Sequence, residues 1–95
     1  MIIELKYDPQ KNALDVVNGT TTVHRNTKFS FSSTTGKLET QFKGDSPDNS
    51  DAPPQTRPAK HEYSATKPGK YQFECFIDGV KAKIGGDMEV LPTEP

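Results

Sequence analysis

Residues 69–77 alternate apolar and polar side chains with a period of two. Tyr71, Phe73, Cys75 and Ile77 occupy every second position, and Gln72 and Glu74 lie between them. Because successive side chains of a β-strand point to opposite faces, this spacing predicts a strand with one buried face. A chain with such a strand must provide a second apolar layer to cover it.

Other segments repeat this alternation, and no stretch of a dozen residues has the apolar spacing of a helix. The alternating segments are residues 1–7, 14–16, 28–32, 38–42, 63–65, 80–84 and 88–90. Seven Gly and eight Pro supply turn signals between them. Seven or eight short strands separated by turns predict an all-β chain, an antiparallel Greek-key β-sandwich. With 95 residues, we expect one domain covering residues 1–95.

Two turn signals predict hairpins. Asn18-Gly19 readily takes the positive φ values of a tight turn, so we expect the strand before it to pair with the strand around Val23. Asn18-Gly19-Thr20 also spells a glycosylation acceptor, although the turn explains it without a sugar. Thr34-Thr35-Gly36 predicts a second hairpin, between residues 28–32 and 38–42.

Three segments together resemble the cupredoxins, the family of plastocyanin and azurin. Residues 69–75 are similar to the penultimate strand, which brings a Cys thiolate to type 1 copper. Residues 84–90 resemble the closing segment, and residues 28–31 resemble the third strand. The resemblance implies a cupredoxin-like β-sandwich.

The copper ligands that the family pattern requires are mostly missing. A type 1 site takes two His, one Cys and a weak axial ligand. No His follows Cys75, Ile84 stands where the axial Met is expected, and the loop 32–37 has no His. The carboxylate of Asp78 is a hard ligand and does not replace the soft nitrogen and sulfur ligands that hold type 1 copper. We therefore expect no cofactor; the alternative is a copper-binding or electron-transfer protein with an atypical site centred on Cys75.

Cys75 has a structural interpretation beside the metal one. It is in register with apolar neighbours, and free Cys is among the most buried residue types, so we expect it to be buried and unreactive. His24 and His61 are the two imidazoles, and neither is at a ligand position of the family.

An immunoglobulin-like sandwich is the alternative fold. Tyr71-Gln72-Phe73-Glu74-Cys75 is similar to that family's F strand, in which an aromatic residue comes two positions before a Cys. That Cys normally pairs with a second one, and a buried Trp is usual. This chain has one Cys and no Trp.

Residues 43–60 form a long Pro-rich stretch with almost no apolar side chains. Pro interrupts hydrogen-bonded ladders, so we expect a loop that contains no strand, buries little and is the most mobile part of the chain. Asp45, Asp48 and Asp51 are spaced by three, but Ser50 and Thr56 stand where a calcium loop needs Gly and Glu. The candidate partner-binding residues of this loop are Asp45, Asp48, Asp51 and Arg57.

Composition and motifs exclude several function classes. Twelve basic and thirteen acidic residues leave no basic surplus for nucleic acid. No segment reaches membrane-spanning length, and no catalytic signature is found, so we name no catalytic residue. We expect a monomeric, non-catalytic binding or interaction domain that contacts another protein through the 43–60 loop. The resemblance implies a periplasmic or extracellular location if a signal peptide has been removed.

Overall fold

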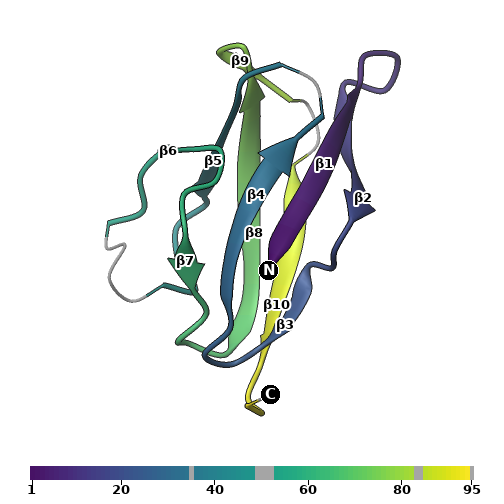
Figure 1. Ribbon diagram of the computed structural model, residues 1–95. Helices are drawn as coiled ribbons and strands as arrows, with labels where there is room; N and C mark the ends of the chain where they lie inside the picture. The colour runs from purple at the N-terminus through teal and green to yellow at the C-terminus, as the bar shows by residue number, and fades with distance from the viewer. Residues whose placement is uncertain (35, 49–52, 83–84, 95) are drawn as a thin grey trace.

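The computed structural model describes residues 1–34, 36–48, 53–82 and 85–94 (Figure 1). These residues form strands and loops and include no helix, which confirms the all-β prediction. In chain order the strands are β1 (Ile2–Asp8), β2 (Ala13–Asn18), β3 (Thr22–His24), β4 (Lys28–Ser33), β5 (Leu38–Phe42), β6 (Arg57–Pro58), β7 (Tyr63–Ser64), β8 (Gly69–Ile77), β9 (Val80–Lys81) and β10 (Gly86–Leu91).

The strands form two sheets. The four-stranded sheet has the order β2-β1-β4-β7, and the six-stranded sheet has the order β3-β10-β8-β5-β6, with β9 paired to β8 (Figure 1). The long strand β8 lies between β10 and β5, as the hydrogen-bonded neighbour of both. The strand that carries Cys75 is therefore central in the larger sheet.

Both sheets are mixed, so the expectation of a purely antiparallel fold is wrong. β1 pairs with β4 in parallel, and β10 pairs with β3 in parallel. The chain crosses from one sheet to the other between strands that are consecutive in sequence. A strand that follows such a crossing can therefore pair with a strand that is distant in sequence, and no short turn then requires the two to be antiparallel. Alternation of side chains reports which face of a strand is buried, but it carries no information on the direction of the partner.

The two predicted hairpins are also wrong. β2 and β3 belong to different sheets, and so do β4 and β5. Gly19 does have a positive φ of 84°, but the chain uses the turn to cross from one sheet to the other. Of the predicted turn 34–36, Thr35 lies outside the described residues. The hairpin that the structure does contain near the start joins β1 to β2.

The described residues contain ten strands, more than the seven or eight expected. Three of the ten, β6, β7 and β9, have only two residues each and are too short to show alternation. β6 corrects the expectation that no strand interrupts the Pro-rich loop. It pairs with β5 at the edge of the sheet. An edge strand has a partner on one side only, so the missing N–H of Pro58 is tolerated there.

One hydrophobic core fills the space between the sheets. Phe31 of β4 lies against Phe73 of β8, with ring centroids 4.8 Å apart, and Phe42 of β5 packs edge-on to Tyr63 of β7. Each of these pairs joins the two sheets, since β4 and β7 belong to one and β5 and β8 to the other. The predicted inward positions are confirmed for Ile3, Leu5, Phe29, Phe31, Leu38, Phe42, Tyr63, Ala65, Tyr71, Phe73, Cys75, Met88 and Val90.

A buried polar contact crosses the same core. The Thr40 hydroxyl lies 3.2 Å from the Tyr63 hydroxyl, and both residues are about 1% exposed. Buried hydroxyls are stable when they are hydrogen-bonded to each other. This contact ties β5 to β7 and sets the position of the chain just after the Pro-rich segment.

Candidate functional site

Cys75 lies in the middle of the core, as predicted. Its side chain is 1% exposed and shares its face with Tyr71 and Phe73, which are also buried. Burial raises the pKa of the Cys75 thiol to about 12, because an apolar setting disfavours the thiolate. The thiolate is the form that binds metals and attacks electrophiles, so a protonated, covered thiol is poorly suited to either role.

The two imidazoles make contacts at the surface. Nδ1 of His24 lies 3.1 Å from the Thr93 hydroxyl, and the His61 ring packs edge-on to Tyr63 with centroids 4.7 Å apart. Among the described residues, no three His, Cys, Asp or Glu side chains are grouped as metal ligands. Ile84, the residue at the axial position of the family pattern, lies outside the described ranges.

The candidate residues of the 43–60 loop have different surroundings. Asp45 is exposed, Asp48 is buried, and Arg57 is half-buried on β6. Asp51 lies outside the described residues. The Asp48 carboxylate accepts a hydrogen bond from the Ser64 backbone N–H at 3.1 Å, which links the loop to β7. The structure thus assigns Asp48 an anchoring contact inside the protein.

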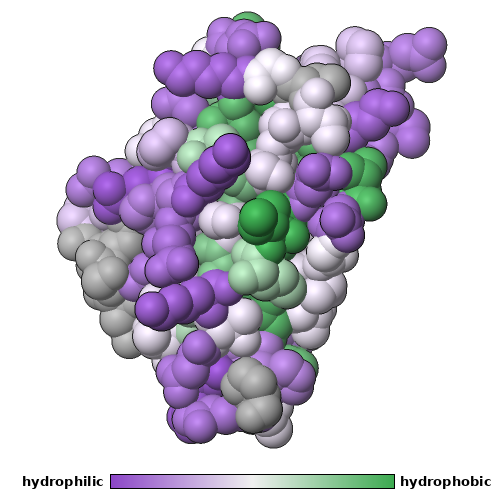
Figure 2. Space-filling model, viewed as in Figure 1, coloured by the Kyte–Doolittle hydropathy of each residue, from purple (hydrophilic) through white to green (hydrophobic). Residues whose placement is uncertain are grey.

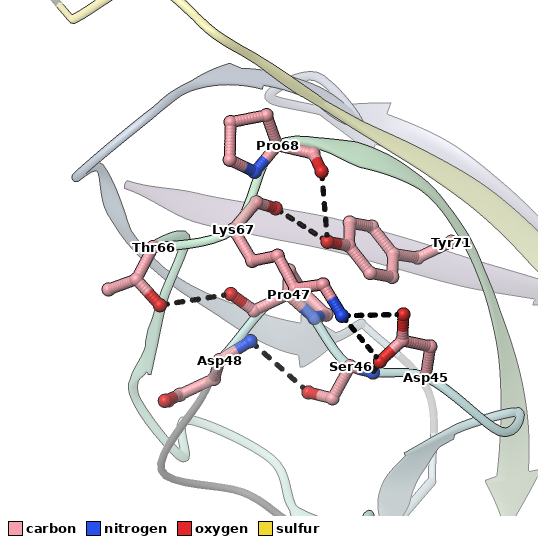
Figure 3. Close-up of polar contacts among 8 residues, drawn as sticks. All are labelled: Asp45, Ser46, Pro47, Asp48, Thr66, Lys67, Pro68 and Tyr71. Atoms are coloured by element: carbon pink, nitrogen blue, oxygen red, sulfur yellow. Dashed lines mark hydrogen bonds and ion pairs between the residues drawn. The ribbon is translucent and has the colours of Figure 1, made fainter.

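Residues 46–48, which we call the loop anchor, are buried. Figure 3 shows their polar contacts. The Pro47 carbonyl accepts hydrogen bonds from the backbone N–H of Thr66 at 3.0 Å and of Lys67 at 3.2 Å. The Thr66 hydroxyl donates to the same carbonyl at 3.3 Å, and the Ser46 hydroxyl accepts from the Asp48 N–H at 3.2 Å. The expectation that this loop buries little is therefore wrong for its first part. Hydrogen bonds hold it in place where apolar side chains are lacking.

An exposed ion pair lies beside the loop anchor. The Lys67 ammonium contacts both carboxylate oxygens of Asp45, at 2.9 and 3.1 Å (Figure 3). Hydrogen bonding to Lys67 lowers the pKa of Asp45, and the same bond raises the pKa of Lys67. Both groups are solvated, so the pair adds orientation to the start of the loop and little stability.

Tyr71 completes the contacts around the anchor. Its hydroxyl donates to the Lys67 carbonyl at 2.5 Å and lies 3.4 Å from the Pro68 carbonyl (Figure 3). Burial raises the pKa of this phenol. A Tyr at the start of a strand that bonds to the backbone a few residues upstream is known as a tyrosine corner. Here the corner fixes the turn that leads from the anchor into β8.

A groove of about 700 Å³ with several charged lining residues begins at the same place, on the outer face of the six-stranded sheet. Its lining includes Lys43 and Asp45 from the start of the loop and residues of β8 and β10. The side chains of Lys70, Asp87 and Glu89 make no hydrogen bond or ion pair with another residue of the described ranges. These three charges are therefore available to a ligand.

Sequence reasoning missed this groove, although the pattern contained a signal. The groove residues Lys70, Gln72, Asp87 and Glu89 are the polar members of the alternation whose apolar members were used to predict the core. Strand pairing brings them together, since Asp87 is opposite Gln72 and Glu89 is opposite Lys70. Without the pairing, nothing in the sequence shows that these residues are neighbours.

The face seen in Figure 2 is largely hydrophilic, with small apolar areas near the N-terminus and along β2. The exposed large apolar residues are Met1, Ile2, Val16, Val17 and Val80. Scattered residues of this kind are normal for a protein surface and do not define a contact site. The groove is on the other sheet and is lined by charges.

Comparison with protein-family models, with curated proteins and with solved structures found no match for the chain. The described residues also include no helix with the length and apolarity needed to cross a membrane. Any assignment of function therefore depends on the chemistry of the described residues.

Proposed function

We propose that the chain is a cupredoxin-like Greek-key β-sandwich without a type 1 copper site, and that it acts as a non-catalytic binding domain. Two observations support a sandwich of two sheets: the sheets share one core, and the Cys75 strand is central in the larger one. The cupredoxin type is proposed from the resemblance of residues 69–75 and 84–90 to the last strands of that family. The single Cys and the absence of Trp weigh against the immunoglobulin-like alternative.

The chemistry around Cys75 supports the loss of copper. The sequence has no His after Cys75, and burial raises the pKa of the thiol to about 12. Copper would have to displace a proton from a thiol without help from an imidazole in the next few residues. The alternative, a Cys75-centred copper or electron-transfer site, has no supporting contact among the described residues.

The observation that carries the binding proposal is a set of groove charges that make no direct ion pair, although Lys70 and Glu89 are opposite each other in the β8–β10 ladder. Lys43 is 3.8 Å from Glu74, and Asp45 pairs with Lys67, so these two lining residues already have partners. Lys70, Asp87 and Glu89 have none among the described residues and line the same groove. A ligand that offers both signs of charge would complete the pairing.

The partner that fits these charges is a polar segment of another protein. An extended segment with an acidic group for Lys70 and a basic group for Asp87 or Glu89 would match the groove. The loop anchor holds the adjacent start of the 43–60 loop in a fixed position, so less ordering is required when a partner binds there. A formal charge of −1 gives no reason to expect nucleic acid.

Site-specific photo-crosslinking in the native cell tests this proposal. A photoreactive residue replaces Gln72 in the groove, and a matched variant carries it at Gln10 in the β1–β2 turn. We expect a discrete adduct with one protein from position 72 and none of that adduct from position 10. Lys70→Glu should abolish the adduct while leaving the unfolding midpoint unchanged. Equal adducts from both positions, or adducts insensitive to Lys70→Glu, would contradict the proposal.

A further inference from the structure

Asn18 and Gly19 form an exposed pair at the end of β2. Asn18 is the last residue of this edge strand, and Asn18, Gly19 and Thr20 are all exposed. Asn18 is also the one Asn in the sequence that is followed by Gly. Asn12 is followed by Ala13, and Asn26 is followed by Thr27.

The local geometry brings the Asn18 side chain onto the next peptide group. The Gly19 backbone N–H donates to Asn18 Oδ1, with a nitrogen to oxygen distance of 3.0 Å. Gly19 has a φ of 84°, a conformation that Gly adopts without steric penalty. Because Gly has no side chain, nothing on residue 19 shields its own nitrogen from the neighbouring carboxamide.

We propose that Asn18 is a site of spontaneous deamidation, with Gly19 as the attacking residue and water as the co-reactant. Base in the solvent removes the Gly19 N–H proton, and the nitrogen bonds to Asn18 Cγ. The bond from Cγ to the side-chain nitrogen then breaks, and that nitrogen takes up a proton and leaves as ammonia. Water opens the resulting five-membered imide at either carbonyl, which gives aspartate or isoaspartate. The net change is one water consumed and one ammonia released.

The modification would alter the edge of the four-stranded sheet. Asn18 is directly opposite Glu4 in the β1–β2 ladder, so a new carboxylate would place like charges across from each other. The backbone here has little room, because a side-chain carbon on Gly19 would lie 2.7 Å from the Ile2 carbonyl oxygen. The isoaspartate product adds a methylene to the main chain at this crowded point. Both products therefore loosen the end of the ladder.

Peptide mapping by mass spectrometry tests the proposal on the full, folded chain. The protein is incubated in mildly alkaline buffer beside a synthetic peptide of residues 13–23. We expect Asn18 to convert to a mixture of aspartate and isoaspartate at a rate within about tenfold of the peptide, a barrier difference of about 1.4 kcal/mol. Asn12 and Asn26 serve as internal controls and should keep their amides.

Asn18→Gln provides the matched variant, because attack by the next nitrogen would then form a larger and slower ring. It should remove the conversion at position 18 and leave the fold unchanged. If the folded chain retains its Asn18 amide while the peptide converts, the fold protects the site and the proposal is wrong. Conversion of Asn12 or Asn26 at the same rate would also overturn it, since the Gly19 geometry would then have no role.

Discussion

Strand β8 and the loop anchor are both buried, but different interactions keep them there. β8 buries Tyr71, Phe73 and Cys75 against the apolar side chains of the opposite sheet. The loop anchor buries a serine, a proline and an aspartate, and its contacts are hydrogen bonds to the backbone around residues 64–67. Burial by apolar packing leaves a periodic pattern in the sequence, whereas burial by hydrogen bonding does not.

Truncation of the β8 core should have the largest effect on stability. Phe73 is 3% exposed, and its ring contacts Phe31 and Phe42. Phe73→Ala should lower the free energy of unfolding by about 3–5 kcal/mol, because it removes apolar contacts and leaves a cavity. Urea unfolding measures the loss, and Phe73→Leu should show a smaller one. A loss from Phe73→Ala no greater than that from Asp48→Ala would break the comparison.

Substitution and chemical labelling of Cys75 test whether its surroundings in β8 are apolar and closed to solvent. Cys75→Ser should cost about 1–3 kcal/mol, because a hydroxyl replaces a thiol in an apolar setting. The native thiol should react with a thiol reagent only when denaturant is present. Rapid labelling of the folded protein, at the rate of an unfolded control, would show that the core is open at this point.

The raised pKa of the Cys75 thiol also predicts how the free energy of unfolding changes at alkaline pH. Its pKa is about 12 in the folded chain and 9.0 as the ordinary value. A raised folded pKa means that the contribution to stability is complete below about pH 9 and is lost as the pH rises through about 12. Urea unfolding across this range should show a steeper alkaline loss for the native chain than for Cys75→Ala.

Asp48 provides the corresponding test of the loop anchor. Asp48→Ala should lower the free energy of unfolding by about 1–2 kcal/mol, because the Ser64 N–H loses its acceptor. Asp48→Asn keeps an acceptor oxygen and should lose less. If Asp48→Ala has no effect on urea unfolding, hydrogen bonding does not hold the anchor and the proposed contrast with β8 fails.

Asp45 is the matched control for Asp48, since it is in the same segment but solvated. Asp45→Asn should leave the unfolding midpoint unchanged at neutral pH, because its pair with Lys67 is exposed. The pKa of Asp45 is lowered in the fold, so any contribution is present above the ordinary value of 3.8 and is lost as the pH falls through the folded value. A clear midpoint shift at neutral pH would show that the exposed pair matters more than the buried carboxylate.

Copper addition should produce the smallest response of all. Titration of the reduced protein with Cu(II) should give no intense visible band, because Cys75 is protonated and lacks the imidazole partners of a type 1 site. Cys75→Ala should give the same spectrum as the native chain. An intense blue or green colour that disappears in Cys75→Ala would replace the binding proposal with the copper alternative.

The sequence predicted burial well and pairing poorly. Alternation identified the inward positions of β1, β8 and β10, because each inward residue contacts the core that the two sheets share. It did not identify which strands are neighbours, so the crossings after β2 and β4 were mistaken for hairpins. The turn dipeptide at Asn18-Gly19 specifies a local φ, and both a hairpin and a crossing between sheets are compatible with it.

The candidate site was predicted only in part, for the same reason. Asp45 and Asp48 were chosen for their place in a polar loop, and the structure separates them into a solvated ion pair and a buried anchor. That difference depends on which backbone groups lie next to each carboxylate. The groove charges on β8 and β10 likewise become neighbours only through the antiparallel register of these strands.

The parallel pair of β3 and β10 has a consequence for how the chain acquires its structure. Val23 and Val90 are partners in this pair, so more than half of the chain separates two residues that are in register. Contacts at such sequence separation close large loops before any stabilising interaction forms, and proteins dominated by them fold slowly. During synthesis β3 therefore emerges long before its partner exists. Its apolar residue Val23 must stay exposed or be screened by other factors until β10 has left the ribosome.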